Sequence, residues 1–286
     1  MFGFLNIYKP KGMTSHDVVA VLRRLTMIKQ IGHTGTLDPF AEGVLPICIG
    51  KSTRLIEYLA DDKEYLATVQ FGSNTTTYDL EGDIVENFDK KITEKELLAE
   101  LENFKGEISQ LPPVYSAIKV NGKKLYEYAR KGEDVEITPR KVIISKIELK
   151  SFDENSQSAQ ILIACSKGTY IRSIAYDLGK NLKCGGYLTN LIRTKAGNFT
   201  LDSSVKLDDL KQAPETIVDH LINPIDVLDL PKIKLSDENH EKVLHGMAIM
   251  NNFENCADFV LLIYNNHISA VGQFNGNKIL IKKVFE

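Results

Sequence analysis

The segment GHTGTLDP, residues 32–39, holds the residue types in this chain that are best suited to chemistry. It carries a histidine, two threonines and Asp38 between an expected amphipathic helix and the apolar run GVLPICIG. Hinge glycines precede Asp38, and Pro39 follows it and restricts the backbone. The carboxylate could therefore be presented at the mouth of a cleft. A lone aspartate in a loop is more often part of an Asx-turn or a helix cap. Both interpretations stay open on this octet alone.

Other motifs that could do chemistry fail on spacing. Gly50-Lys51-Ser52 resembles the tail of a phosphate-binding P-loop, but the glycine required five residues before Gly50 is Leu45. The sequence contains neither Gly-x-Gly-x-x-Gly nor His-Glu-x-x-His, so a dinucleotide site and that zinc site are unsupported. The cysteines lie far apart without a Cys-x-x-Cys pair, which predicts neither a zinc site nor a disulfide framework. They are Cys48, Cys165, Cys184 and Cys256.

Length and composition bound the class of protein. The chain has 286 residues, 43% hydrophobic and 26% charged, which fits one large soluble domain or one large domain with a smaller one. No apolar run approaches the roughly 18 residues of a membrane span. The N-terminus, MFGFLNIYKPKG, lacks the pattern of a secretory leader. These features predict a cytoplasmic protein without a membrane partner. The chain is further expected to be a monomer that requires no protein partner.

The formal net charge of −3 is distributed unevenly. Residues 1–35 sum to +4, residues 119–141 to +3 and residues 167–198 to +5, so these segments total +12 and the rest of the chain −15. If the three segments converge in space, they form a basic face that could bind a polyanion. If they do not, they are solvated helix faces.

The hydrophobic periodicity predicts mixed α and β structure. Helical spacing occurs from Ser15, a possible N-cap, to residue 28, then over 94–104 behind a Thr93/Glu96 capping box, and over 170–182 before Gly185 and Gly186. Strand patterns occupy 64–72, 141–150 and 159–165. Strands outnumber helices without a regular βαβ alternation. The expected fold class is therefore α+β, a mixed and largely antiparallel sheet with flanking helices.

Two further segments stand apart from this pattern. Residues 119–141 combine turn residues with many charges and read as a long excursion from the body. A break near 223–231 precedes short strand-like runs split by Asn and Gly turns. The chain is therefore expected to divide into a large domain, residues 1–228, and a small β-rich domain, residues 231–286.

Five ordered segments together resemble the bacterial tRNA pseudouridine-55 synthases, the TruB family. They are LNIYKPKGMTSHDVV, GHTGTLDPFAEGVLPICIGKSTR, KEYLATVQFG, PPVYSAIKVNGKKLYEYARKG and SKGTYIRSIAYDLGKNLKCGGYLTNLIRTKAGNF. The resemblance covers residues 5–200 closely, and the C-terminal segment weakly resembles a reduced PUA-like RNA-binding domain. It implies an isomerase that acts on a T-loop uridine of tRNA without cofactor or metal, after flipping the base out of the RNA.

The resemblance assigns roles position by position. Asp38 corresponds to the nucleophile, which attacks either the ribose or the pyrimidine ring, and Arg172 to its ion-pair partner. Tyr65 resembles the residue that stacks on the uracil and takes a proton. Three further residues match substrate positions: His33, which fills the space left by the flipped base, Tyr170 and Leu191. Tyr170 and Arg172 are two apart, which suggests a strand end that turns both side chains to one site.

The excursion resembles a mobile thumb that closes over RNA, with Tyr126 and Tyr128 anchoring it to the body. Basic residues along the chain are expected to contact RNA phosphates; they are Lys9, Lys11, Lys119, Lys123, Lys124, Arg130 and Arg193. Two rival functions remain at this stage. One is RNA binding without modification. The other is glycoside hydrolysis, which would need a second carboxylate, and the motif offers only Glu42.

Overall fold

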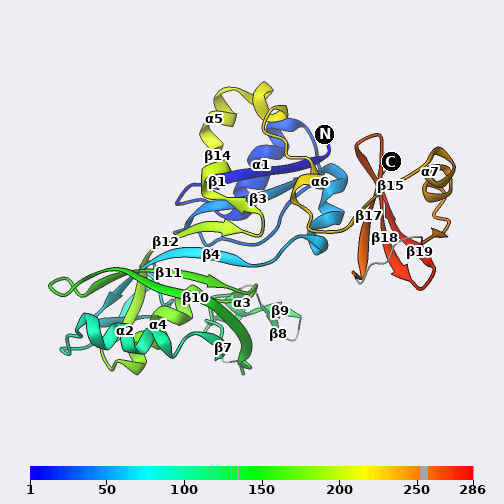
Figure 1. Ribbon diagram of the computed structural model, residues 1–286. Coiled ribbons are helices and arrows are strands. Elements are labelled where there is room, and N and C mark those ends of the chain that lie inside the picture. The colour runs from blue at the N-terminus through cyan, green and yellow to red at the C-terminus, as the bar shows by residue number, and fades with distance from the viewer. Residues whose placement is uncertain (117, 121, 130, 134, 252–256, 286) are drawn as a thin grey trace.

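A computed structural model of the chain describes residues 1–116, 118–120, 122–129, 131–133, 135–251 and 257–285. In these residues the central element is a ten-stranded sheet with the order β14-β1-β3-β12-β4-β11-β10-β7, in which β2 pairs with β3 and β13 with β12 (Figure 1). Its strands are β1 (Gly3–Lys9), β2 (Ile31–His33), β3 (Glu42–Ile49), β4 (Lys63–Phe71), β7 (Gly106–Gln110), β10 (Arg140–Asp153), β11 (Ser158–Cys165), β12 (Gly186–Ala196), β13 (Phe199–Thr200) and β14 (Val205–Lys206).

The strand pairing confirms the expected fold class. Within the described part of the chain, the parallel pairs of this sheet are β1 with β14 and β3 with β12, and the others are antiparallel. β4 alternates buried and half-buried residues, because one of its faces packs on the core and the other is only partly covered. β3 is buried along nearly its whole length, as its apolar sequence requires.

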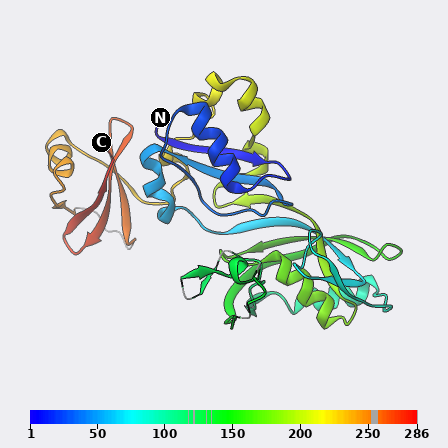
Figure 2. The same cartoon turned by 180° about the vertical axis from the view of Figure 1, so that it is seen from behind.

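Helices cover the sheet in two separate groups, one on each half (Figure 1, Figure 2). On the N-terminal half, α1 (Ser15–Thr26) and α5 (Leu207–Gln212) bury aliphatic residues against β1 and β3. On the other half, α2 (Glu94–Glu102) and α4 (Ile171–Asn181) pack against β4 and β11. β4 and β12 run through the middle and join the two halves, so residues near their centre lie at the junction.

The helix starts partly follow the sequence prediction. Thr93 and Glu96 form the expected capping box, so the start of α2 is confirmed. For α1 the prediction of Ser15 as the N-cap is wrong: Thr14 is the cap, in a capping box with Asp17. The Ser15 hydroxyl instead exchanges hydrogen bonds with the backbone N–H and C=O of Leu37 at 2.8 and 3.1 Å. Ser15 therefore ties α1 to the loop that carries Asp38.

β3 and β12 pair over a short stretch near the middle of the sheet. Their parallel pairing involves only two residue pairs, Ile192 with Glu42 and Arg193 with Gly43. Gly43 has φ +106°, and a Cβ there would lie 2.4 Å from the carbonyl oxygen of Arg193. Only glycine allows this approach of the two backbones. The loop before β3 is thereby held close to β12.

Several shorter elements complete this part of the chain. Two two-stranded sheets pair β5 with β6 and β8 with β9. The elements are β5 (Ser73–Thr75), β6 (Ile84–Asn87), β8 (Lys119–Val120), β9 (Lys123–Lys124), α3 (Leu125–Ala129), α6 (Pro224–Val227) and the 3-10 helices η1 (Gly50–Tyr58), η2 (Leu201–Ser203) and η3 (Pro214–Val218). β8, β9 and α3 lie in the excursion that the sequence analysis singled out.

A second sheet of five strands follows α6, in the order β15-β17-β18-β19-β16. Its elements are β15 (Lys232–Lys234), α7 (Asp237–Leu244), β16 (Ile249–Met250), β17 (Phe259–Tyr264), β18 (His267–Asn275) and β19 (Lys278–Val284). Figures 1 and 2 place it beside the N-terminal half of the large sheet. Lys51 and Arg54 of η1 donate hydrogen bonds to the carbonyls of Phe285 and Val284, each at 2.8 Å.

The structure also bears on the expectations about membrane spans and cysteines. No helix in the described residues is long and apolar enough to cross a membrane. Cys48, Cys165 and Cys184 are buried free thiols, whereas Cys256 lies outside the described residues.

Candidate active site

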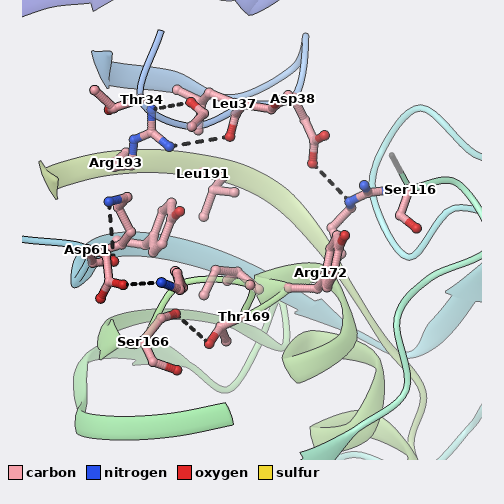
Figure 3. A pocket seen from close by; sticks show the side chains of 18 of the residues that line it. Thr34, Leu37, Asp38, Asp61, Ser116, Ser166, Thr169, Arg172, Leu191 and Arg193 are labelled. Carbon is pink, nitrogen blue, oxygen red and sulfur yellow. Dashed lines mark hydrogen bonds and ion pairs between the residues drawn. The ribbon is translucent and has the colours of Figure 1, made fainter. Parts of the chain in front are cut away.

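A cavity of about 760 Å³ opens where β4 and β12 pass between the two halves of the large sheet. The loop of residues 34–39 covers one side, Tyr65 and Leu191 come from β4 and β12, and residues 166–172 close the opposite side. Figure 3 shows Asp38 and Arg172 at one end of the cavity and Asp61 at the other, with Leu191 between them. The cavity is large enough to hold a nucleoside.

Asp38 and Arg172 form an ion pair at the first end of the cavity. Arg172 Nε lies 3.0 Å from Asp38 Oδ2, and the two side chains are 7% and 34% exposed. The guanidinium is therefore buried, while the carboxylate keeps a face toward the cavity. The expected pairing of these two residues is present in the structure. Their expected placement on a strand end is wrong, because Tyr170 is the N-cap of α4 and Arg172 lies in the first turn of that helix.

A second carboxylate, Asp79, completes the surroundings of Arg172. Arg172 Nη1 lies 3.4 Å from Asp79 Oδ2, and the same guanidinium donates hydrogen bonds to the carbonyls of Thr77 and Tyr115 at 3.3 and 3.0 Å. Asp79 is itself fixed by the Thr77 hydroxyl at 2.5 Å and the Glu81 N–H at 3.0 Å. The sequence analysis missed Asp79. Its context, TTTYDLEG, reads as an ordinary Asx-turn, and only its position beside Arg172 marks it as part of the site.

The protonation of Asp38 depends on opposing effects. Burial raises the pKa of the Asp38 carboxyl above its ordinary value, and the Arg172 guanidinium acts against that shift. The neighbouring Asp79 also raises this pKa, and the Lys9 ammonium lowers it. Arg172 is thus the group that most favours the ionised form of Asp38.

Two buried cations hold the loop that carries Asp38. Arg193 is 1% exposed, and it donates hydrogen bonds to the carbonyls of Gly35 at 3.2 Å, Thr36 at 3.3 Å and Val44 at 2.6 Å. Lys9 is fully buried, and its ammonium donates to the carbonyls of Pro10, Met13 and Pro39. The expectation that Lys9 and Arg193 contact RNA phosphates is therefore corrected, because neither charge reaches the surface.

Comparison with known proteins agrees with this geometry. A sequence profile described as "TruB family pseudouridylate synthase (N terminal domain)" matches residues 23–171, and one described as "tRNA pseudouridylate synthase B C-terminal domain" matches residues 172–228. The chain is 43% identical to tRNA pseudouridine synthase B of Caldanaerobacter subterraneus subsp. tengcongensis, over 99% of both chains. It is 44% identical to the protein of that name from Carboxydothermus hydrogenoformans, over 100% of this chain and 99% of the relative.

The chain belongs to the TruB family of pseudouridylate synthases. It is therefore an enzyme, and its reaction class is isomerisation. Among solved structures it resembles the crystal structure of a Cbf5-Nop10-Gar1 complex, with a TM-score of 0.74, 25% identity, and coverage of 100% of this chain and 85% of that one. The family resemblance inferred from the five sequence segments is confirmed.

The remaining residues that were predicted to contact the substrate lie in or beside the cavity. Tyr65 and Leu191 line it and are 8% and 4% exposed. Burial raises the pKa of the Tyr65 phenol, which is therefore protonated at neutral pH. Tyr170 also lines the cavity, and its backbone is held by Gln110 through hydrogen bonds of 2.8 and 2.9 Å. His33 precedes the lining loop, and burial lowers the pKa of its imidazole, which favours the neutral form.

Three basic residues of the positively charged segments, Lys9, Arg172 and Arg193, are buried and therefore add no charge to the surface. Lys11 is half-exposed and lies 3.6 Å from Glu42. Lys119 and Lys123 are exposed on β8 and β9, and Lys124 follows at intermediate burial.

The sequence analysis expected Arg130 to contact RNA, and Tyr126 and Tyr128 to anchor the excursion to the body. Arg130 lies outside the described residues, and the side chain of Tyr126 is likewise not described. Tyr128 donates a hydrogen bond to the Val120 carbonyl at 3.1 Å, and Lys123 lies over its ring. These interactions of Tyr128 lie within the excursion itself, so they differ from the expected anchorage to the body.

Proposed function

We propose that this enzyme converts uridine 55 in the T loop of tRNA to pseudouridine, with Asp38 as the nucleophile. The observation that carries the proposal is the Asp38 carboxylate, open to a nucleoside-sized cavity and paired with the buried Arg172. The relatives at 43–44% identity bear the name tRNA pseudouridine synthase B, which favours tRNA as the substrate class.

The reaction is an isomerisation, so its atoms balance within one nucleotide. The bond between ribose C1′ and uracil N1 breaks, the base turns, and a bond forms between C1′ and C5. The proton on C5 leaves and N1 gains one. A target base inside a folded RNA loop must first leave its stack to reach the cavity. Asp38 then forms a transient covalent adduct with either C1′ or the pyrimidine ring, and is released when the new bond is complete.

The cavity walls suit the other steps. Tyr65 offers a flat, buried ring on which the uracil can stack, and Leu191 adds apolar contact. The raised pKa of Tyr65 favours this stacking role over that of a proton acceptor. His33, at the end of β2, is suited to fill the space that the flipped base leaves in the RNA. Tyr170 borders the cavity beside Arg172.

Exposed basic side chains would bind the phosphates of the RNA that lies outside the cavity. The exposed Lys119 and Lys123 of the excursion are suited to phosphate contacts, and the half-exposed Lys11, which lies 3.6 Å from Glu42, is suited to another. We further propose that residues 1–228 form the catalytic domain and that residues 231–286, a small PUA-like domain, add RNA-binding surface. No cofactor or metal enters the proposed chemistry.

Glycoside hydrolysis with Glu42 as the second carboxylate finds no support in the geometry. The candidate second carboxylate, Glu42, accepts a hydrogen bond from the Tyr8 hydroxyl at 2.7 Å and pairs with Lys11. It is not among the residues that line the cavity. Asp38 and Glu42 therefore do not face a common substrate position, as the acid and nucleophile of a glycosidase must.

The direct test uses an RNA stem-loop with the sequence of a tRNA T arm. After incubation with the enzyme, carbodiimide mapping and mass spectrometry should locate one pseudouridine, at the position of uridine 55. An RNA with cytidine at that position is the matched control and should yield none. Modification elsewhere, or release of free uracil, would contradict the proposal.

A further inference from the structure

The charges that line the cavity do not cancel. Three of its carboxylates have a cationic partner: Asp38 pairs with Arg172, Asp61 with Lys167 at 2.6 Å, and Glu57 with Lys283. Two lining cations, Lys63 and Arg193, have no carboxylate within ion-pair distance among the described residues. An unpaired cation beside a cavity is a site for an anion, because the buried charge is stabilised when the anion arrives.

Of these two cations, Lys63 is the one that can reach a ligand. The guanidinium of Arg193 is 1% exposed and already occupied by three backbone carbonyls. The ammonium of Lys63 has only long hydrogen bonds, to the carbonyls of Asp61 at 3.3 Å and Asp62 at 3.4 Å. Such weak backbone interactions leave donor capacity on the ammonium for a substrate group.

The strand geometry points Lys63 to the same space as Tyr65. The two residues lie two apart on β4, so their side chains project to one face of the sheet, and both line the cavity. Lys63 Cε and Arg193 Nη1 each lie 3.9 Å from the point that a Cβ on Gly35 would occupy. Lys63 therefore lies next to the loop of residues 34–39, which carries Asp38. Figure 3 shows Asp61, whose carbonyl holds Lys63, across the cavity from Asp38.

If a uridine binds with its ribose at Asp38, so that the carboxylate attacks C1′, its base extends across Tyr65 and Leu191 toward this opposite end. When the bond between C1′ and N1 breaks, the electron pair stays on the uracil, whose ring spreads the negative charge over its nitrogens and carbonyl oxygens. The RNA phosphates continue in both chain directions and remain at the mouth of the cavity, whereas the flipped base enters it. The anion that arises within the cavity is therefore the detached base.

We propose that Lys63 is a further catalytic residue of this enzyme, whose ammonium stabilises the negative charge that develops on the uracil as it leaves the ribose. The inference rests on the proposed function. It assigns to Lys63 a role in the transition state and the intermediate, and little role in binding the ground-state RNA. The ammonium keeps its proton throughout, so the balance of the isomerisation is unchanged.

The decisive measurement is single-turnover pseudouridine formation on the T-arm RNA, together with the dissociation constant of that RNA. Lys63→Met should lower the saturated rate roughly 10- to 100-fold and change the dissociation constant less than about threefold. Lys63→Arg keeps the charge and should recover a large part of the rate. Lys195→Met is the matched control: Lys195 pairs with Asp62 at 3.2 Å beside the same turn but does not line the cavity, and its rate should equal that of the wild type.

A better leaving group supplies a second readout that a loss of folding cannot imitate. In 5-fluorouridine RNA, the fluorine makes the departing base less basic, so it needs less electrostatic support. The ratio of wild-type to Lys63→Met rates for loss of the bond between C1′ and N1 should therefore be smaller with this RNA than with uridine. An equal ratio for both RNAs would contradict a role in charge stabilisation.

The pH profile gives a third readout. Burial lowers the pKa of Lys63 to about 8, and Arg193 on β12 lowers it too, while Asp61, Asp62 and Cys165 raise it. If the ammonium is required, the wild-type rate falls as pH rises through about 8. In Lys63→Arg that fall should move to higher pH, because guanidinium stays charged.

Three outcomes would overturn the assignment while leaving the proposed function intact. One is a wild-type rate in Lys63→Met. Another is a loss that appears only in the dissociation constant, with a shallower salt dependence, which would make Lys63 a phosphate-binding residue. The third is an unchanged pH profile in Lys63→Arg. If the wild-type enzyme forms no pseudouridine in T-arm RNA, it is the proposed function that fails.

Discussion

Two segments that border the cavity differ in how the fold holds them. The loop of residues 34–39 is fixed on one side by Arg193, through the carbonyls of Gly35 and Thr36, and on the other by Lys9, through the carbonyl of Pro39. The segment between β7 and β10 contains only the short β8–β9 hairpin and the five-residue helix α3 among its described elements. Its Lys119 and Lys123 are exposed.

This difference separates two tasks. A nucleophile must be held in place before the substrate arrives, because reorganisation during the reaction costs rate. A surface that grips RNA phosphates works through exposed charge and can adjust on binding. The comparison therefore predicts that substitutions at the fixed loop change the chemical rate, whereas substitutions in the excursion change affinity.

The largest effect is expected at Asp38. Asp38→Asn removes the nucleophile while keeping the size of the side chain, so single-turnover pseudouridine formation should fall by at least about 10³-fold. The dissociation constant of T-arm RNA should stay within a few-fold of the wild-type value. Mass spectrometry must show that the variant has not deamidated. Pseudouridine formation by an Asn variant that has not deamidated would contradict the assignment of Asp38 as the nucleophile.

A smaller loss is expected at Arg172, with a change in pH dependence. Burial already raises the pKa of Asp38, and removing the guanidinium that opposes this shift raises it further. Arg172→Met should therefore lower the rate at neutral pH by roughly 100-fold and move the acidic limb of the pH–rate profile to higher pH. Arg172→Lys should lie between, since it keeps the charge without the forked geometry.

The control for this prediction is thermal unfolding of each variant, because Arg172 also pairs with the buried Asp79. A Met variant that folds normally, with a rate scaled down at every pH and an unmoved acidic limb, would mean that Arg172 orients Asp38 and does not govern its ionisation.

A substitution at Arg193 tests whether the reaction requires the hydrogen bonds that hold the loop of residues 34–39 in place. Arg193→Met removes the donors to Gly35, Thr36 and Val44, so the loop should lose its fixed position and the single-turnover rate should fall about tenfold. Because the side chain is buried, the RNA dissociation constant should hardly change. Arg193→Lys should retain part of the rate. A weaker affinity with an unchanged saturated rate would instead support the original expectation that Arg193 binds an RNA phosphate.

The excursion should give the smallest effect, and it should fall on affinity. Lys119→Ser combined with Lys123→Ser should weaken T-arm RNA binding roughly tenfold at moderate salt. The slope of log K against log salt should become shallower by about 0.7–0.9 for each phosphate that the variant no longer neutralises. Binding titrations at several salt concentrations measure both quantities. A fall in the saturated rate as large as that of Arg193→Met would show that the excursion also shapes the catalytic site.

Much of the fold could be predicted because it is local. The alternation of β4, the helical spacing of α4 and the Thr93/Glu96 capping box are set by neighbours within a few residues, and each is present in the structure. Errors occurred where local patterns permit two solutions. Thr14 and Ser15 can both cap a helix, and the hydrogen bonds between Ser15 and Leu37, twenty-two residues away, decide between them.

The sequence by itself determined the family, the likeness of Asp38 and Arg172 to a catalytic pair, and the residue types available around them. Only the tertiary structure decided which basic residues hold the backbone, which face the cavity and which are exposed to solvent. Lys9, Lys63, Arg193 and Lys119 are equally basic in the sequence, yet two are buried against carbonyls, one faces the cavity and one meets solvent. The reason is physical: the role of a charge depends on its burial and on its partners, and these come from segments far apart in the chain.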